Sequence, residues 1–285
     1  MSAMRRALAL AAAALLAGCS TLQLAYDNAD TYARWEARAY LDVHDEQSDE
    51  LDARIAAFHA WHREKALPQY AQLAVEAGRR LERGLSREDL LWGYDAVRAQ
   101  VRESVRAAAV EAAGLLDRLG PEQLEHLAQR LAEDNRKFAR EDLAGTPEER
   151  RERRTKRNLE RLEDWLGGLS DAQAERVRQY SERAALIDEL RDRDRKRRQA
   201  EFLDLLRARQ ARARLADWAA DWESGRVPEY AAAVRANLEE YFSMLLDLDR
   251  SLSPVQRRTA LERLARYRGD IEQLMRAGAA REPAQ

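Results

Sequence analysis

The sequence contains a single cysteine, Cys19, among its 285 residues. An intramolecular disulfide is therefore excluded, and packing alone must stabilise the fold. Residues that favour strands are also scarce, since isoleucine occurs only at Ile55, Ile187 and Ile271. After Cys19 no apolar run approaches the roughly 20 residues that a membrane-spanning helix needs. The rest of the chain therefore offers no second candidate for a membrane anchor.

Common catalytic motifs are missing as well. No serine lies in a Gly-x-Ser-x-Gly turn, no glycine-rich phosphate loop is present, and Cys19 is the only thiol. With 51 acidic residues, no pair of carboxylates stands out as an acid and a base. The sequence predicts a protein that is not an enzyme, has no cofactor and has no identifiable small-molecule substrate. The 49 basic residues nearly balance the acidic ones, which argues against a nucleic-acid partner, because such binding needs a segregated basic face.

The first nineteen residues have the pattern of an export signal. Arg5 and Arg6 precede an apolar run, residues 7–16, that is too short to span a bilayer. The following Leu-Ala-Gly-Cys19 resembles the lipobox of bacterial lipoproteins, which implies cleavage before the cysteine and lipid attachment to it. We expect residues 1–18 to be the signal peptide and residues 19–25 to be the lipidated cysteine and a short spacer. Ser20 stands where an aspartate would mark inner-membrane retention, so the usual sorting rule implies the outer membrane, facing the periplasm.

The remainder of the chain predicts an all-α fold. Alanine, leucine, arginine and glutamate predominate, and apolar residues recur at three- and four-residue spacing. We expect a single elongated multi-helix domain over residues 26–276 and a disordered tail over residues 277–285. Each apolar stripe is expected to face the core, for example Leu90, Tyr94, Val97 and Val101, or Leu238, Tyr241, Phe242, Leu245 and Leu246. Core packing is also expected for most of the six tryptophans, with an exposed aromatic groove as the alternative.

A Leu-x-x-x-Gln frame recurs at residues 119–123, 169–173 and 252–256. It predicts helix starts, because a serine caps the first free amides, a proline fits the first turn, and the glutamine bonds back to the cap. Residues 43–47 are a variant with His44 at the cap. Asn135 places an amide on an apolar stripe, and we interpret it as a residue that fixes helix pairing.

Two stretches, residues 145–158 and 191–198, lack apolar residues and are rich in charged ones. Mixed-sign runs of this kind are typical of a solvated helix or loop. The alternative is a docking site for an acidic partner or a lipid headgroup.

The strongest hint of chemistry is a pair of histidines, His59 and His62. Three residues apart on a helix, they could share one metal ion. The glutamate of the zincin motif is absent, because Ala60 follows His59. The alternative interpretation is that both histidines satisfy polar groups at the edge of the core.

Several segments resemble one proteobacterial family of periplasmic lipoproteins of unknown function. They are residues 22–30, Trp35, residues 40–41, 61–63, 67–70, 133–136 and 165–166, and the two later helix starts. The resemblance covers nearly the whole mature chain and implies no activity and no catalytic residues. More loosely, the Leu-Ser-x-x-Gln frame is similar to the Leu-Thr-x-x-Gln repeats of the much shorter Spy-type periplasmic chaperones.

The leading hypothesis is a non-enzymatic helical lipoprotein that binds or positions another envelope protein. It would be held to the membrane by lipid on Cys19. The second is a Spy-like chaperone. The third, a metal-dependent hydrolase, depends on metal at His59 and His62.

Overall fold

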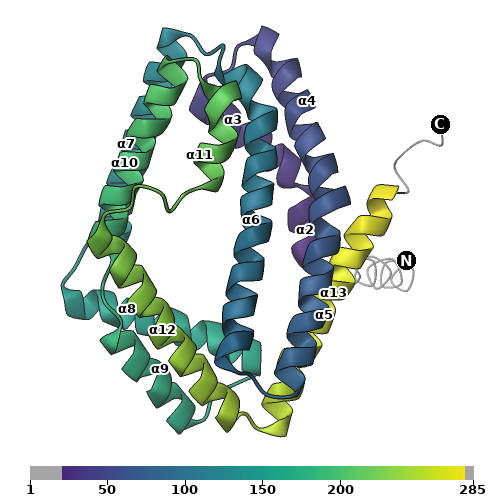
Figure 1. Cartoon of the computed structure of the whole chain (residues 1–285), viewed down its shortest axis with the longest axis vertical. Coiled ribbons are helices and arrows are strands. Elements are labelled where there is room, and N and C mark those ends of the chain that lie inside the picture. The colour runs from purple at the N-terminus through teal and green to yellow at the C-terminus, as the bar shows by residue number, and fades with distance from the viewer. Residues whose placement is uncertain (1–20, 280–285) are drawn as a thin grey trace, which may run out of the picture.

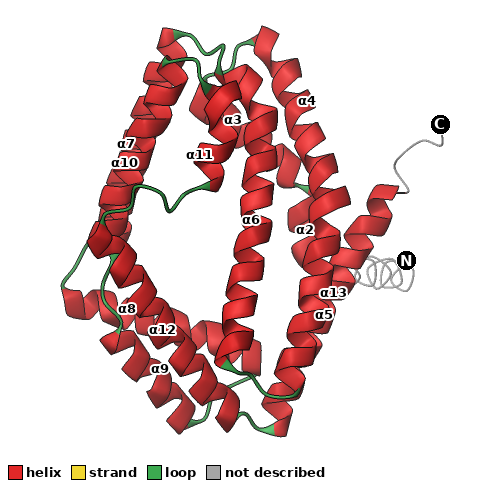
Figure 2. Ribbon diagram, viewed as in Figure 1, coloured by secondary structure: helices red, strands yellow, loops and turns green. Residues whose placement is uncertain are grey.

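A computed structural model describes residues 21–279, and every regular element in that range is a helix (Figure 2). The described chain contains no strand, so the single domain is all-α, as the sequence predicted. The α-helices are α2 (Thr21–Asp27), α3 (Ala29–Leu41), α4 (Asp45–Trp61), α5 (Leu67–Glu82), α6 (Arg87–Leu116), α7 (Pro121–Asp142), α8 (Pro147–Leu166), α9 (Asp171–Arg183), α10 (Asp188–Arg207), α11 (Ala216–Ala220), α12 (Pro228–Ser251) and α13 (Pro254–Ala279). Two π-helical segments, η1 (His62–Ala66) and η2 (Ala211–Leu215), precede α5 and α11.

The helices form a frame of pairs instead of wrapping a common axis (Figure 1). α7 and α10 lie side by side along one edge, and α5 packs against α13 along the other. α9 contacts both α8 and α12 at one end of the frame. The long helix α6 contacts α4, α5 and α11, and α2 near the N-terminus packs against α13 near the C-terminus.

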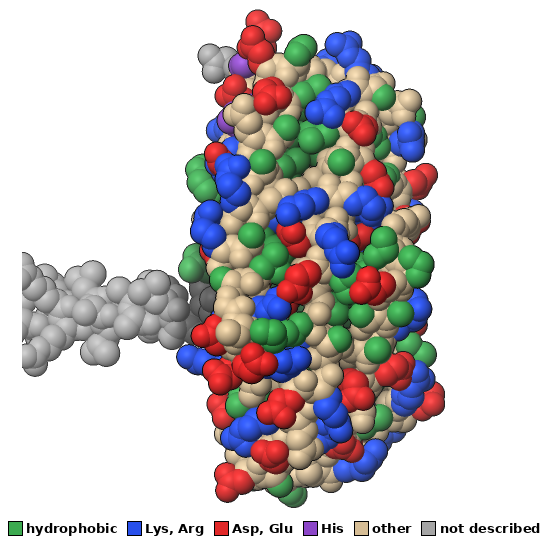
Figure 3. Space-filling view, turned by 90° about the vertical axis from the view of Figure 1, so that its left-hand side faces the viewer, with side chains coloured by type: hydrophobic (Ala, Val, Ile, Leu, Met, Phe, Trp, Pro, Cys, Tyr) green, Lys and Arg blue, Asp and Glu red, His purple; other side chains and the backbone are tan. Residues whose placement is uncertain are grey.

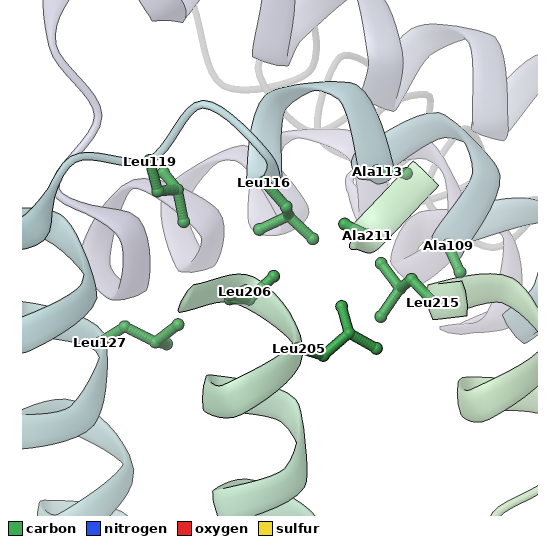
Figure 4. Close-up of a cluster of buried hydrophobic side chains, with 9 residues drawn as sticks. All are labelled: Ala109, Ala113, Leu116, Leu119, Leu127, Leu205, Leu206, Ala211 and Leu215. Atoms are coloured by element: carbon green, nitrogen blue, oxygen red, sulfur yellow. The ribbon is translucent and has the colours of Figure 1, made fainter. Parts of the chain in front are cut away.

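Two clusters of buried apolar side chains stand out among the buried residues. The larger cluster gathers α6, α7, α10 and η2 around leucines and alanines (Figure 4). The smaller one joins α9 to α12 through Val177, Met244 and Leu248, of which the first two are fully buried. Each large apolar side chain buried in this way stabilises the fold by about 1.5–3 kcal/mol. The core is thus divided between two ends of the frame.

The predicted helix starts are present. At the start of α9, Ser170 Oγ accepts a hydrogen bond from the Gln173 amide at 3.3 Å, and Gln173 Oε1 accepts one from the Ser170 amide at 2.9 Å. Ser253 and Gln256 make the same reciprocal pair at the start of α13. At the start of α4 the His44 amide donates to Gln47 Oε1 at 3.3 Å, which places His44 at the cap.

The glutamines of these frames also join helices to one another. Gln123 Nε2 donates to the carbonyls of Leu41 and Asp42 at the end of α3, at 3.1 and 3.0 Å. Gln173 Nε2 donates to the Ser251 carbonyl at the end of α12, at 3.1 Å. The last carbonyls of a helix have no partner within it, so an amide from another helix satisfies them. The repeated frame therefore builds helix joints as well as helix starts.

Asn135 makes the bonds that a role in helix pairing requires. It lies on α7, donates to Gln199 Oε1 of α10 at 2.7 Å and accepts from Arg195 of α10 at 2.6 Å. The two charge-rich stretches are helical over most of their length, in α8 and α10. None of the described helices combines the length and the apolar character of a membrane span.

Three features differ from the sequence-based expectations. α2 begins at Thr21, inside the expected spacer 19–25, and α13 continues to Ala279, beyond the expected end at residue 276. Val97 and Val101 remain 51% and 39% exposed, although their stripe was expected to face the core. Val97 lines a cavity between α6 and α12, so no helix packs directly on this side chain.

The tryptophans also differ from expectation, because none of the six falls among the buried core residues. Trp35 is 63% exposed. Trp92, Trp165, Trp218 and Trp222 all line cavities. Five of the six are partly buried, and Trp218 packs against the larger core cluster, so most tryptophans lie at the edge of the core.

Candidate functional site: an apolar groove along α6 and α12

The two histidines lie together in a cluster of aromatic rings. His59 is near the end of α4 and His62 begins η1. The Tyr26 hydroxyl of α2 is 3.1 Å from His62 Nδ1, and the Tyr26 ring centre is 4.6 Å from that of His59. Cys19, the other predicted site residue, lies outside the described residues.

Pro68 explains the local backbone at His62. Proline has no amide hydrogen, and its ring clashes with the carbonyl four residues earlier in a regular helix. The helix widens just before it, and the Leu67 amide bonds to the His62 carbonyl five residues back. This π-helical turn sets the position of His62 against Tyr26.

The environment favours neutral imidazoles. Burial lowers the pKa of His62, with a further contribution from His59, and burial together with Arg63 lowers the pKa of His59. Between residues 21 and 279, no three or more histidine, cysteine or acidic residues converge into a group able to hold a metal ion. The alternative interpretation was that both histidines satisfy polar groups at the edge of the core. His62 bonds to the Tyr26 hydroxyl, whereas the buried Nε2 of His59 has no hydrogen-bond partner in the described chain. Metal binding at His59 and His62 stays a prediction.

The most distinctive hollow in the described chain is an apolar groove of about 550 Å³. We use the name apolar groove for this hollow between α5, α6 and α12. Its size is that of a ligand or side-chain binding pocket. The wall consists almost wholly of aliphatic and aromatic side chains, contributed by Ala77, Leu81, Leu85, Leu90, Trp92, Tyr94, Val97, Leu238, Tyr241, Phe242, Leu245 and Leu264.

A second cavity of about 220 Å³ continues the groove toward α8 and shares Leu81, Leu85, Tyr241 and Leu245 with it. Together the two cavities extend along α12 from Leu238 to Leu248. That stretch measures about 15 Å at 1.5 Å per residue. The result is an elongated apolar trough about three helical turns long.

Aromatic contacts fix the walls of the groove. The rings of Tyr94 and Phe242 meet edge to face across it, with centres 6.2 Å apart. The Arg80 guanidinium lies 4.0 Å above the Trp92 ring and holds the indole in place. Phe242 is only 4% exposed, whereas Val97 is 51% exposed. The groove therefore has a rigid floor and an open apolar rim.

Charges near the groove are neutralised within the protein. Asp89, which is 6% exposed, accepts hydrogen bonds from Arg80 at 2.6 Å and Arg83 at 2.7 Å. Burial by itself would raise the pKa of Asp89, but bonds from the Ser86 amide and hydroxyl and from both arginines lower it to about 2. Asp249 similarly accepts from the Leu85 amide at 2.9 Å and from Arg257 at 2.9 Å. Asp89 and Asp249 thus join neighbouring segments through paired charges, and the surface of the apolar groove stays apolar.

The sequence predicted the apolar faces of α6 and α12. Both faces were expected in the core, whereas in the structure part of each lines the apolar groove. The number of apolar residues on α12 was the available signal for a groove. Met244 and Leu248 already supply the face that packs on α9, so the other apolar residues need a different partner. Leu238 and Phe242 line the groove outside that contact, whereas Tyr241 belongs to both, since its ring centre is 5.5 Å from that of Tyr180 of α9. A helix with two apolar faces needs two partners, and only one is a close-packed helix.

Comparison with protein families shows which family the chain resembles over most of its length. The model of the Family of unknown function (DUF6279) matches residues 39–231. No curated protein and no solved structure matches the chain.

Proposed function

We propose that this chain, which belongs to the DUF6279 family of unknown function, is a non-enzymatic, lipid-anchored binding protein of the bacterial cell envelope. Its apolar groove would receive the apolar face of a helix from another envelope protein. The observation that carries the proposal is the open trough of aliphatic and aromatic side chains between α6 and α12. Lipid on Cys19 would hold the protein at the outer membrane, facing the periplasm.

The shape of the trough supports a helix as the occupant. A length of about three turns accommodates anchors at positions i, i+4 and i+7 of a partner helix. Val97 lies at the rim and Val101 follows one turn later, and both are exposed, so the apolar strip continues along α6 beyond the cavity. Exposed apolar surface of this extent marks interaction sites in soluble domains.

The expected anchor is compatible with this role. Only Ser20 lies between Cys19 and α2, which begins at Thr21. α2 is in turn fixed to the body of the protein, since Gln23 Nε2 donates to Gln273 Oε1 of α13 at 2.6 Å. Lipid on Cys19 would therefore hold the domain directly at the membrane surface, with no flexible tether.

Site-specific crosslinking in living cells tests the proposal. A photoreactive amino acid replaces Val97 in the full chain, and the matched control replaces Val255 of α13, which is 63% exposed and lies outside the groove. We expect one discrete adduct from position 97 that is absent from position 255. Equal adduct patterns at both positions, or none at position 97, would contradict the proposal.

A Spy-like chaperone is the second candidate, and the open apolar trough also favours it. Client chains would bind the same surface without a fixed partner. The crosslinking experiment separates the two functions. A broad smear of exported proteins at position 97 that increases under folding stress indicates a chaperone, whereas one band of constant size indicates a dedicated partner.

A further inference from the structure

Another cavity, separate from the apolar groove and its extension, lies between α10, the end of α11 and the start of α12. Its volume is about 330 Å³. We call it the arginine cavity. Four arginines line it: Arg191, Arg195, Arg198 and Arg226. Four aromatic residues complete its walls: Phe202, Trp218, Trp222 and Tyr230. Asp194 is the only acidic residue in its lining.

The cavity uses one face of α10. Arg191, Arg195 and Arg198 follow one another at spacings of four and three residues, so their side chains emerge on the same side of the helix. The sequence alone suggested that this run, residues 191–198, is solvated. In the structure Arg195 and Arg198 are only partly exposed, and Arg198 lies 4.2 Å above the Trp218 ring.

These three guanidiniums have no carboxylate partner within 4.0 Å anywhere in the described chain. Arg195 bonds to the neutral Asn135 Oδ1 at 2.6 Å and to the Asp134 carbonyl, and Arg198 bonds only to backbone carbonyls. Burial lowers the pKa of Arg198. Figure 3, which views the molecule from the side where α7 and α10 lie in Figure 1, shows acidic and basic side chains interspersed over the surface.

The one acid of the cavity does not neutralise them. Asp194 bonds to Arg197 at 2.8 Å and lies 3.9 Å from Arg226. One further donor, Nε of Arg195, is hidden from solvent and has no hydrogen-bond acceptor. Arg226, by contrast, is neutralised, because it also pairs with Glu223 at 3.1 Å. Buried donors and charges normally find partners. The arginine cavity therefore has excess positive charge and unused hydrogen-bond donors.

We propose that the arginine cavity binds the phosphate group of a small ligand or of a lipid headgroup. Guanidinium forks match the geometry of phosphate oxygens and bind them in a bidentate manner. A phosphate monoester carries about 1.5–2 negative charges near pH 7, which matches three unneutralised arginines better than the single charge of a carboxylate. The aromatic walls would exclude water and pack against the body of the ligand.

Titration of the full chain in neutral-detergent micelles tests this site. Isothermal titration with inorganic phosphate at constant ionic strength gives the Kd. Arg191→Gln is the test variant, because Arg191 makes no side-chain hydrogen bond or ion pair in the described chain and stacks only on Phe138. Arg193→Gln is the matched control on the same helix, since Arg193 is exposed and lies outside the cavity.

We expect Arg191→Gln to weaken phosphate binding at least about tenfold, as for the loss of a charged hydrogen bond. Arg193→Gln should change the Kd less than about twofold. No binding by the wild type, or equal Kd values for the two variants, would overturn the proposal.

The same variants identify the source of the phosphate. Mixed micelles that contain phosphatidic acid are compared with micelles that contain phosphatidylcholine, and the Tm is measured. A Tm increase with phosphatidic acid that Arg191→Gln abolishes and Arg193→Gln retains supports a lipid headgroup. An increase with inorganic phosphate alone, with the same dependence on Arg191, supports a soluble phosphate ester.

Discussion

At the scale of single residues, buried glutamines have an unusually large structural role. Gln173 is 3% exposed, accepts from the Ser170 amide and donates to the Ser251 carbonyl, so it serves one helix start and one helix end. Gln173→Leu would leave both backbone groups without a partner, and we expect the free energy of unfolding to fall by about 1–3 kcal/mol. Urea denaturation followed by circular dichroism measures the change.

The control for this substitution lies on the same helix. Gln179 is exposed and bonds only to Glu175 at 3.3 Å. Gln179→Leu should change the unfolding free energy by less than about 0.5 kcal/mol. Equal losses in the two variants would show that the buried joint contributes nothing specific.

At the scale of helices, the contact of α2 with the histidine pair should depend on pH. Burial and the nearby charges depress the pKa of His59 and His62 in the folded state. Neutral imidazoles therefore stabilise the docked helix above the unfolded pKa of about 6.5, and this stabilisation is lost as the pH falls through the lower folded values. Protonation of His62 Nδ1 would also remove its ability to accept from the Tyr26 hydroxyl.

Hydrogen exchange of the α2 amides measures this effect. After correction for the intrinsic pH dependence of exchange, protection of α2 should be weaker at pH 5 than at pH 7.5. Protection of α9, which has no histidine, should not change in this way. The double variant His59→Leu, His62→Leu should lose the pH dependence of α2 protection. If α2 of that variant is still less protected at pH 5 than at pH 7.5, the two histidines are not the cause.

Individual helices show what the sequence could predict and what it left open. Composition predicted the all-α class, and the capping chemistry of the Leu-x-x-x-Gln frame predicted where α7, α9 and α13 begin. Periodicity could not show what covers an apolar face. The Val97 stripe on α6 was therefore assigned to the core, although half of Val97 is exposed. A helix encodes its own amphipathicity, whereas the distance to its neighbour depends on the whole fold.

A run of charged residues, like an apolar stripe, does not show what packs against it, and the arginine cavity is an example. The run at residues 191–198 was interpreted as solvated because of its mixed charges, with a docking site for an acidic partner or a lipid headgroup as the alternative. The spacing of Arg191, Arg195 and Arg198, followed by Phe202 four residues later, was the available signal of a shared face. The aromatic residues that complete the cavity, Trp218 and Trp222, come from a distant part of the chain.

At the scale of the whole molecule, the two proposed sites differ in their relation to the family. The arginine cavity, from Arg191 to Tyr230, lies entirely within the matched residues 39–231. The apolar groove takes one wall from α5 and α6 inside that range and the other from Leu238 to Leu264 beyond it.

The proposed lipid anchor and its destination can be tested at Cys19 and Ser20. With lipid on Cys19, two or more acyl chains would anchor the protein stably, because each buried methylene contributes about 0.8 kcal/mol. Cys19→Ser should prevent processing and lipid attachment, so that radiolabelled palmitate no longer enters the protein and the protein leaves the outer-membrane fraction.

Ser20→Asp should keep the lipid but move the processed protein to the inner-membrane fraction. Palmitate labelling and density-gradient separation of the two membranes measure both results. A Cys19→Ser protein that is still processed and still labelled would exclude this cysteine as the anchor, whereas a Ser20→Asp protein that stays in the outer membrane would show that its destination is set elsewhere.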